Sequence, residues 1–300
     1  MTHPFKGAGV ALITPFKPDY SVDFNILEEL VEDQISSGTD YIVALGTTGE
    51  TPTLSTEEQK DIIRCIRAKI NKRIGLVVGI GGNDPHKVIS AIEATGFEGI
   101  DALLSVTPYY SRPGQEGLTE HYKLIAKASP VPVILYNVPS RTGVNLLSET
   151  AVKIAQACPN VIAVKEASGE CSQVAKTVKH APAHFAVISG DDALALPMIA
   201  VGAIGVISVI ANALPGKLSH LVHCANEGRM SDAREIHLQL IDLLKLIFQE
   251  GSPAGVKALM QIMGKTPNVL RLPLTPVSRE LQKNLETELS KILQTAAASL

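Results

Sequence analysis

Short apolar runs rich in β-branched residues recur along the first two thirds of the chain, with helical patterns between them. The runs occupy residues 9–16, 41–46, 74–81, 101–108, 131–137, 161–168, 185–190 and 203–209. Successive runs start 18 to 33 residues apart, and most of these intervals fit one strand plus a crossover helix. The pattern therefore predicts eight parallel strands, each followed by a helix.

Two of the intervening helices carry capping signals. Ser55 and Glu58 have the spacing of a capping box, and Asp84 stands before Pro85 as an N-cap followed by proline. Eight such units close naturally into a barrel, whereas an open doubly wound sheet usually has a glycine-rich first turn. Because the first turn, ITPFKPDYS, contains no glycine, we expect an α/β protein with a (β/α)8 TIM barrel.

The strand pattern stops after the eighth run. Residues 231–249 have the pattern of a long amphipathic helix, and the pairs Ser252-Pro253 and Thr275-Pro276 each open another helix. No linker rich in Gly and Ser precedes these helices. We predict a barrel over residues 1–225 and a small C-terminal helical domain over 226–300, packed on the barrel or between subunits.

Composition and charge narrow the class of protein. Apolar residues make up 45% and charged residues 19% of the 300, and the net charge is −3. This balance gives no electrostatic reason to expect nucleic acid or a membrane surface as a partner. The start, MTHPFKGAG, lacks the features of a signal peptide, and no apolar run approaches the ~18 residues of a membrane span. The four cysteines form no CxxC pair, so we expect reduced thiols in a cytoplasmic protein.

A lysine interrupts the sixth apolar run, VIAVKEASG at 161–169. Desolvation disfavours a charged ammonium, so a buried Lys165 would hold more of the neutral amine. A neutral amine attacks a carbonyl to form a Schiff base, which draws electrons from the neighbouring carbon. Alternatively, Lys165 extends out of the strand end and pairs with Glu166 or another acid.

A tyrosine ends the fifth run, one strand–helix unit before this lysine. In barrel enzymes the active site lies at the carboxyl ends of the strands, so Tyr136 and Lys165 can stand side by side there. The hydroxyl of Tyr136 would then carry protons during imine formation. Alternatively, Tyr136 is a half-buried aromatic whose hydroxyl is bonded to the backbone.

Two further strand ends offer groups suited to carboxylates. In GTTGE (46–50), glycines let the backbone approach a ligand, and Thr47 and Thr48 offer hydroxyl and N–H groups. Arg141, in SRTG, presents a planar fork suited to a second carboxylate. Alternatively, GTTGE is only a tight turn, and Arg141 is a solvated surface arginine. Together, the four features indicate a metal-free aldolase or lyase that joins an α-keto acid to a second carbonyl compound.

Other polar features favour structural roles. Asp191 and Asp192 look like a helix N-cap, and no histidine lies at a predicted strand end to complete a metal site with them. His220 and His223 are a pair on a predicted helix, which is more often structural than metallic. The glycines of 79–83 are a weak phosphate-loop candidate without a lysine. We therefore expect neither a metal ion nor another cofactor.

The ordered motifs of the chain resemble those of the 4-hydroxy-tetrahydrodipicolinate synthase family, commonly called dihydrodipicolinate synthases. The motifs are GVALITPF, GTTGE, TPYYSRPGQEGL, YNVPSRTG, VKEASG, SGDD, GVISV and RLPLTP, and they extend over nearly the whole chain. The resemblance implies a lyase that condenses pyruvate with L-aspartate 4-semialdehyde through a lysine Schiff base. That reaction is the branch point toward diaminopimelate and lysine.

The resemblance also implies a role for eight residues. The matching positions are Lys165, Tyr136, Thr47 and Tyr110 as catalytic residues, and Thr48, Arg141, Gly190 and the backbone of Ile207 as substrate-binding residues. Lys165 falls on the Schiff-base position, Thr48 on that of the pyruvate carboxylate and Arg141 on that of the semialdehyde carboxylate. The family's counterpart of Tyr110 is donated by a neighbouring subunit. This implies at least a dimer, and family members are commonly homotetramers built as dimers of dimers.

Two other functions compete with this one. Sibling barrels such as N-acetylneuraminate lyase and keto-deoxy sugar-acid aldolases share the lysine. The neuraminate lyases resemble GSTGE where this chain has GTTGE, and they lack an arginine at the position of Arg141. A polyol substrate has no second carboxylate near its aldehyde, so Arg141 favours the semialdehyde. A non-catalytic keto-acid sensor would have a broken proton relay, whereas all four relay positions are filled.

The family's feedback site for lysine is altered in this chain. Lysine-inhibited members use histidines and a glutamate there, beside an asparagine and a tyrosine. Asn83 and Tyr109 match, but Thr56 and Gln59 fill the histidine positions and Lys87 fills the glutamate position. A cation repels the ammonium group of a lysine ligand, so we expect weak or absent inhibition by lysine.

Overall fold

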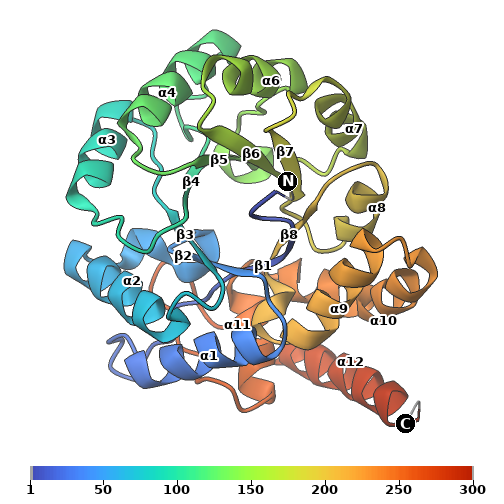
Figure 1. Ribbon diagram of the computed structural model, residues 1–300. Helices are drawn as coiled ribbons and strands as arrows, with labels where there is room; N and C mark the ends of the chain where they lie inside the picture. Colours follow the sequence, from blue (N-terminus) through green and yellow to red (C-terminus); the bar gives the residue numbers. More distant parts are fainter. Residues whose placement is uncertain (1–2, 299–300) are drawn as a thin grey trace.

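Eight parallel strands close into a barrel in the computed structural model, which describes residues 3–298 (Figure 1). The strands are β1 Gly7–Ala11, β2 Tyr41–Ala44, β3 Gly75–Gly79, β4 Ala102–Val106, β5 Val133–Asn137, β6 Val161–Glu166, β7 Ala186–Ser189 and β8 Gly205–Ser208. Each pairs with the next in sequence, and β8 returns to β1 with Gly205 opposite Gly7. The prediction of a TIM barrel is confirmed, and every apolar run overlaps one of the eight strands.

Helices surround the barrel, one or more after each strand (Figure 1). They are α1 Phe24–Ser36, α2 Thr56–Ile70, α3 Pro85–Ala94, α4 Gln115–Ala128, α5 Pro139–Thr142, α6 Ser148–Ala157, α7 Cys171–His180, α8 Ala195–Ala200 and α9 Pro215–Asn226, with 3₁₀ turns η1 Thr47–Gly49, η2 Thr51–Thr53 and η3 Ile210–Asn212. The predicted capping box of Ser55 and Glu58 starts α2, and Asp84 caps α3 ahead of Pro85. Both helix starts are confirmed.

Aromatic side chains fill the amino-terminal end of the barrel. Tyr41 is fully buried, and its ring lies edge-on to that of Phe5 with 5.2 Å between centroids. A Cβ on Gly9 would come within 2.3 Å of the Tyr41 ring, so glycine at this position leaves room for that ring. With this end filled, open space in the barrel lies at the carboxyl ends of the strands.

Three further helices pack along one side of the barrel, beside α9 and α1 (Figure 1). They are α10 Met230–Gln249, α11 Ala254–Ile262 and α12 Arg279–Ala298. Their apolar side chains share one continuous core with β1, α1 and α2. The predicted start of the last helix at Thr275-Pro276 is wrong, because α12 begins at Arg279 and the hydroxyl of Ser278 accepts from the N–H of Leu281. The boundary between 225 and 226 stays a prediction, although α9 does end at Asn226.

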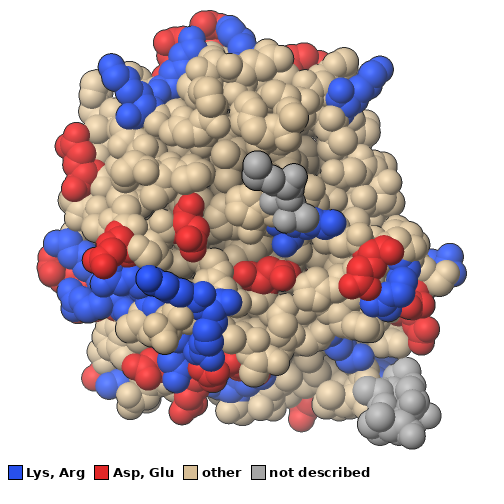
Figure 2. Space-filling model, viewed as in Figure 1, with Lys and Arg blue, Asp and Glu red and all other residues tan. Residues whose placement is uncertain are grey.

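Basic side chains gather on the surface around α2 (Figure 2). Most of them are matched by acids: Lys60 pairs with Glu57, Arg64 with Asp61, and Arg73 with Glu32. Such exposed pairs contribute little stability but neutralise the surface locally. Within residues 3–298, no helix is both long enough and apolar enough to cross a membrane.

Candidate active site

Lys165 and Tyr136 face each other at the carboxyl ends of β6 and β5. Their Cα positions are directly paired in the register of these strands. Lys165 Nζ lies 4.4 Å from the centroid of the Tyr136 ring, and the two residues are only 5% and 7% exposed. Within residues 3–294, nothing forms a hydrogen bond with the Tyr136 hydroxyl. The hydroxyl is therefore available to a ligand that reaches the amine.

Glu166 is not the partner of Lys165. Side chains alternate along a strand, and Glu166 points out of the barrel, where it is 3% exposed. Its carboxylate accepts from Asn137 Nδ2 at 3.0 Å, Gln173 Nε2 at 2.9 Å and the N–H of Ser168 at 2.7 Å. Among residues 3–294, no acid forms an ion pair with Lys165. The interpretation in which Lys165 pairs with an acid is therefore wrong.

The GTTGE segment makes a tight turn at the end of β2. Thr47–Gly49 form η1 and Thr51–Thr53 form η2, with Glu50 between them. A Cβ on Gly49 would lie 3.3 Å from the carbonyl oxygen of Leu12, so this glycine permits close packing against the loop after β1. Thr47 is exposed, whereas Thr48 is 4% exposed. The tight-turn interpretation holds, and the same turn also lines a cavity.

A cavity of about 880 Å³ opens at this end of the barrel. It brings together six of the eight predicted residues, namely Thr47, Thr48, Tyr136, Arg141, Lys165 and Gly190. Its outer wall is α10, which contributes Ile241, Lys245 and Phe248. Sequence reasoning assigned no part of the site to this helix. A pattern of apolar positions does not reveal which residues of an outer helix reach a cavity.

The guanidinium of Arg141 is at the mouth of this cavity. Arg141 lies on the one-turn helix α5 and is exposed. Among residues 3–294, its guanidinium forms a single hydrogen bond, a long one of 3.5 Å from Nη2 to the carbonyl oxygen of Ser252. A bond of that length is weak, so the planar fork retains most of its capacity to bind an anion.

Gly190 leaves room for Ala167 and for the side chain of Lys165. A Cβ on Gly190 would lie 3.1 Å from both Cε and Cγ of Lys165, and 2.8 Å from Cβ of Ala167. Real Cβ atoms essentially never approach closer than 3.0 Å. Any larger residue at this position would displace the lysine or the strand beside it.

Two predicted residues lie outside the cavity. Ile207 is 1% exposed in β8, where it pairs with Gly9. Tyr110 is 91% exposed on the loop after β4, and its φ of 73° is left-handed. An aromatic side chain held out from the surface in this way contacts nothing inside its own cavity.

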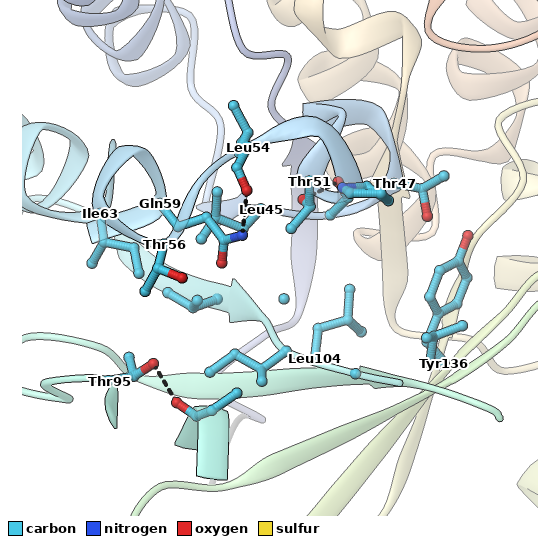
Figure 3. A pocket seen from close by; sticks show the side chains of 18 of the residues that line it. Leu45, Thr47, Thr51, Leu54, Thr56, Gln59, Ile63, Thr95, Leu104 and Tyr136 are labelled. Atoms are coloured by element: carbon cyan, nitrogen blue, oxygen red, sulfur yellow. Dashed lines mark hydrogen bonds between the residues drawn. The ribbon is translucent and has the colours of Figure 1, made fainter. Parts of the chain in front are cut away.

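A second cavity of about 770 Å³ adjoins the first and extends between α2 and α3 (Figure 3). Thr47, Tyr136 and Arg141 line both cavities. Farther out, Thr56 and Gln59 line the second cavity, and Gln59 Nε2 donates to the carbonyl oxygen of Leu54 at 3.1 Å (Figure 3). Three of the five predicted feedback positions, Thr56, Gln59 and Tyr109, therefore line the same cavity as candidate active-site residues.

The acids after β7 act differently from the predicted helix cap. Asp191 Oδ1 accepts from the N–H groups of Ala193 and Leu194, but α8 begins only at Ala195. Asp192 is buried, and its Oδ2 accepts from the N–H groups of Val209 and Ile210. These bonds do not cap a helix; they hold the loop after β8 in place. Burial raises the pKa of Asp192. The N-cap prediction is wrong for Asp192, because the chain uses its carboxylate to join two strand ends.

The remaining polar candidates have structural partners. His223 Nε2 lies 2.8 Å from a carboxylate oxygen of Asp40, and His220 contacts the sulfur of Cys224. A Cβ on Gly79 would come within 2.3 Å of the carbonyl oxygen of Leu45, so close packing accounts for that glycine. Among the residues that the structure describes, no cluster of three or more His, Cys, Asp or Glu could hold a metal ion.

Comparison with known proteins gives one consistent family. The model of the dihydrodipicolinate synthetase family matches residues 4–292. A 4-hydroxy-tetrahydrodipicolinate synthase of Parabacteroides distasonis is 52% identical over 271 residues, which cover 90% of this chain and 91% of that protein. The solved 4-hydroxy-tetrahydrodipicolinate synthase of Methylacidiphilum fumariolicum SolV has a TM-score of 0.95 at 38% identity, covering 98% of each chain. A structure described as a monomeric dihydrodipicolinate synthase variant has a TM-score of 0.93 at 37% identity, covering 96% of this chain and 97% of that one. From its barrel, its lysine–tyrosine pair and these matches, we conclude that the chain belongs to the dihydrodipicolinate synthetase family.

Proposed function

We propose that this protein is a lyase that condenses pyruvate with L-aspartate 4-semialdehyde to 4-hydroxy-tetrahydrodipicolinate, in the route to diaminopimelate and lysine. The observation that carries the proposal is the buried amine of Lys165, 4.4 Å from the Tyr136 ring in a cavity that Thr47, Thr48 and Arg141 also line. Membership of the family and the names of the relatives support the choice of substrates.

The first half of the reaction joins pyruvate to the enzyme. The neutral amine of Lys165 attacks C2 of pyruvate, and loss of one water gives a protonated imine. Tyr136, with Thr47 beside it and Tyr110 from a neighbouring subunit, moves the protons that this exchange requires. Thr48 binds the pyruvate carboxylate, and Gly190 and the backbone of Ile207 line the pocket.

The second half forms the new carbon–carbon bond. The imine loses a proton from C3, and the resulting enamine attacks the aldehyde carbon of the semialdehyde, whose carboxylate Arg141 binds. The amino group of the semialdehyde then attacks the imine carbon, which closes the ring and returns Lys165 as a free amine. One water is released overall, so the reaction needs no oxidant or reductant.

Reductive trapping tests this proposal. The protein is incubated with pyruvate, reduced with borohydride and mapped by mass spectrometry, with and without the semialdehyde. We expect the pyruvate adduct on Lys165, absent from a Lys165→Arg variant, and depleted when the semialdehyde allows turnover. An adduct that the semialdehyde does not deplete would assign the chain to a sibling aldolase. The absence of any adduct on Lys165 would refute the Schiff-base mechanism.

The exposed position of Tyr110 supports an oligomeric enzyme. Tyr110 lines neither cavity of its own chain and is 91% exposed, as expected of a side chain that completes a neighbour's site. We propose a homotetramer built as a dimer of dimers, located in the cytoplasm. Sedimentation of the wild-type protein tests the assembly. A fully active monomer would contradict it.

We also propose weak or absent inhibition by lysine. Thr56 and Gln59 bring no carboxylate to the second cavity, and Lys87 on α3 is exposed and cationic. None of these side chains carries a negative charge that would attract the ammonium group of a lysine ligand. Half-maximal inhibition by lysine below the millimolar range would contradict this part of the proposal.

A further inference from the structure

A second lysine of the chain is buried more completely than Lys165. The side chains of Lys257, on α11, and of Glu50 are both 0% exposed and form an ion pair. Lys257 Nζ also donates to the carbonyl oxygen of Val269 at 2.9 Å and lies 4.4 Å from the centroid of the Phe16 ring. A buried ion pair is weak evidence for stability, since an apolar pair of similar volume often replaces it without loss. Its position therefore needs another explanation.

Glu50 is the last residue of GTTGE and forms the corner between η1 and η2. Its φ of 54° is left-handed, a conformation that costs a non-glycine residue about 1–2 kcal/mol. The backbone N–H of Glu50 donates to the carbonyl oxygen of Thr47 at 3.2 Å, and its own carbonyl accepts from the N–H of Thr53 at 2.9 Å. The corner thus sets the path of the turn that carries Thr47.

The carboxylate of Glu50 is held from two sides by C-terminal segments. One oxygen binds Lys257, and the other accepts from the N–H of Arg271 at 3.0 Å. The guanidinium of Arg271 covers the same Phe16 ring as Lys257, with 4.4 Å to the ring centroid. These contacts connect α11 and the segment after it directly to the turn that lines the candidate active site.

We propose that Glu50 and Lys257 are positioning residues, through which α11 fixes the turn that presents Thr48 to the carboxylate of pyruvate and Thr47 to the proton transfer with Tyr136. The proposal rests on the function proposed above. Neither residue lines the cavity of Lys165, so each acts through the backbone of Thr47 and not on the substrate. Loosening the pair should weaken pyruvate binding before it weakens the fold.

The double variant E50Q/K257M separates these two effects. It removes both charges together, with side chains of similar size, so no charge is left buried alone. We expect thermal unfolding close to that of wild type, and a rise of about tenfold or more in KM for pyruvate. A matched control is Lys265→Met, which breaks an ion pair of 2.6 Å from the same C-terminal region to Asp33 on α1. That variant should keep the wild-type KM.

A folded double variant with the wild-type KM for pyruvate would overturn the proposal. If E50Q/K257M does not fold, Glu50→Asp provides the same test, because it keeps the charge but withdraws the carboxylate by one methylene. An unchanged KM in Glu50→Asp would then overturn it. Borohydride trapping of wild type is measured first. If wild type traps no pyruvate on Lys165, the proposed function fails and this inference fails with it. If wild type traps pyruvate but the variants keep the wild-type KM, only the positioning role is refuted.

Discussion

Gly190→Ala is the sharpest single test of how Lys165 is held. The added Cβ would lie 2.8 Å from Cβ of Ala167 and 3.1 Å from Cε and Cγ of Lys165. Overpacking of this kind costs about 1–3 kcal/mol. Since the end of the lysine side chain is the most movable of the three neighbours, we expect the strain to appear as a displaced amine. At about 1.4 kcal/mol per tenfold, imine formation should slow by roughly 5- to 150-fold.

The assay is the rate of pyruvate trapping on Lys165 under borohydride, with kcat/KM for the full reaction measured in parallel. Gly96→Ala is the matched control, because a Cβ at Gly96 would meet nothing within 4 Å. It should trap pyruvate as fast as wild type. A Gly190→Ala protein that is as stable and as fast as wild type would show that Gly190 does not constrain the lysine.

Three further outcomes follow from the described contacts. Burial lowers the pKa of His121 to about 4, so between pH 6.5 and pH 4 the imidazole binds a proton only in the unfolded chain. The free energy of unfolding should therefore fall by at most about 3 kcal/mol as the pH decreases through this range. Urea titrations of His121→Phe should not show this loss of stability. Glu166→Gln should cost about 1–3 kcal/mol in urea unfolding, because a donor would then face the amides of Asn137 and Gln173, and an unchanged midpoint would contradict the described network. Arg141→Gln should raise KM for the semialdehyde by tenfold or more while pyruvate trapping stays normal; equal losses with both substrates would argue against a separate carboxylate receptor.

The fold was predictable because strands of a parallel barrel are buried on both faces. Their apolar runs stand out at intervals of one strand plus one helix, and all eight were located. The start of the last helix was not, because Thr275-Pro276 has the sequence of a helix opening, whereas α12 begins at Arg279, after Ser278 has bonded through its N–H and hydroxyl to the carboxylate of Glu250. Local capping chemistry does not reveal such tertiary contacts.

The site was predictable where its residues belong to neighbouring strands. The spacing of Tyr136 and Lys165 placed them side by side, and the register confirms this adjacency. Lys257 also stands in an apolar run, AGVKALM, and carries the same signal as Lys165. One lysine faces a cavity and the other an acid 207 residues away in the sequence. Nothing local to either run distinguishes a free amine from a paired one.

Closure of the barrel has a consequence for synthesis of the chain. β1 can pair with β8 only after residues 205–208 exist, and Glu50 can meet Lys257 only after α11 exists. A ribosome makes about 5–20 residues per second, so the first strand keeps one edge unpaired for many seconds. Unpaired edges of this kind invite aggregation, and the free edge of β1 is covered only once residues 205–208 can reach it.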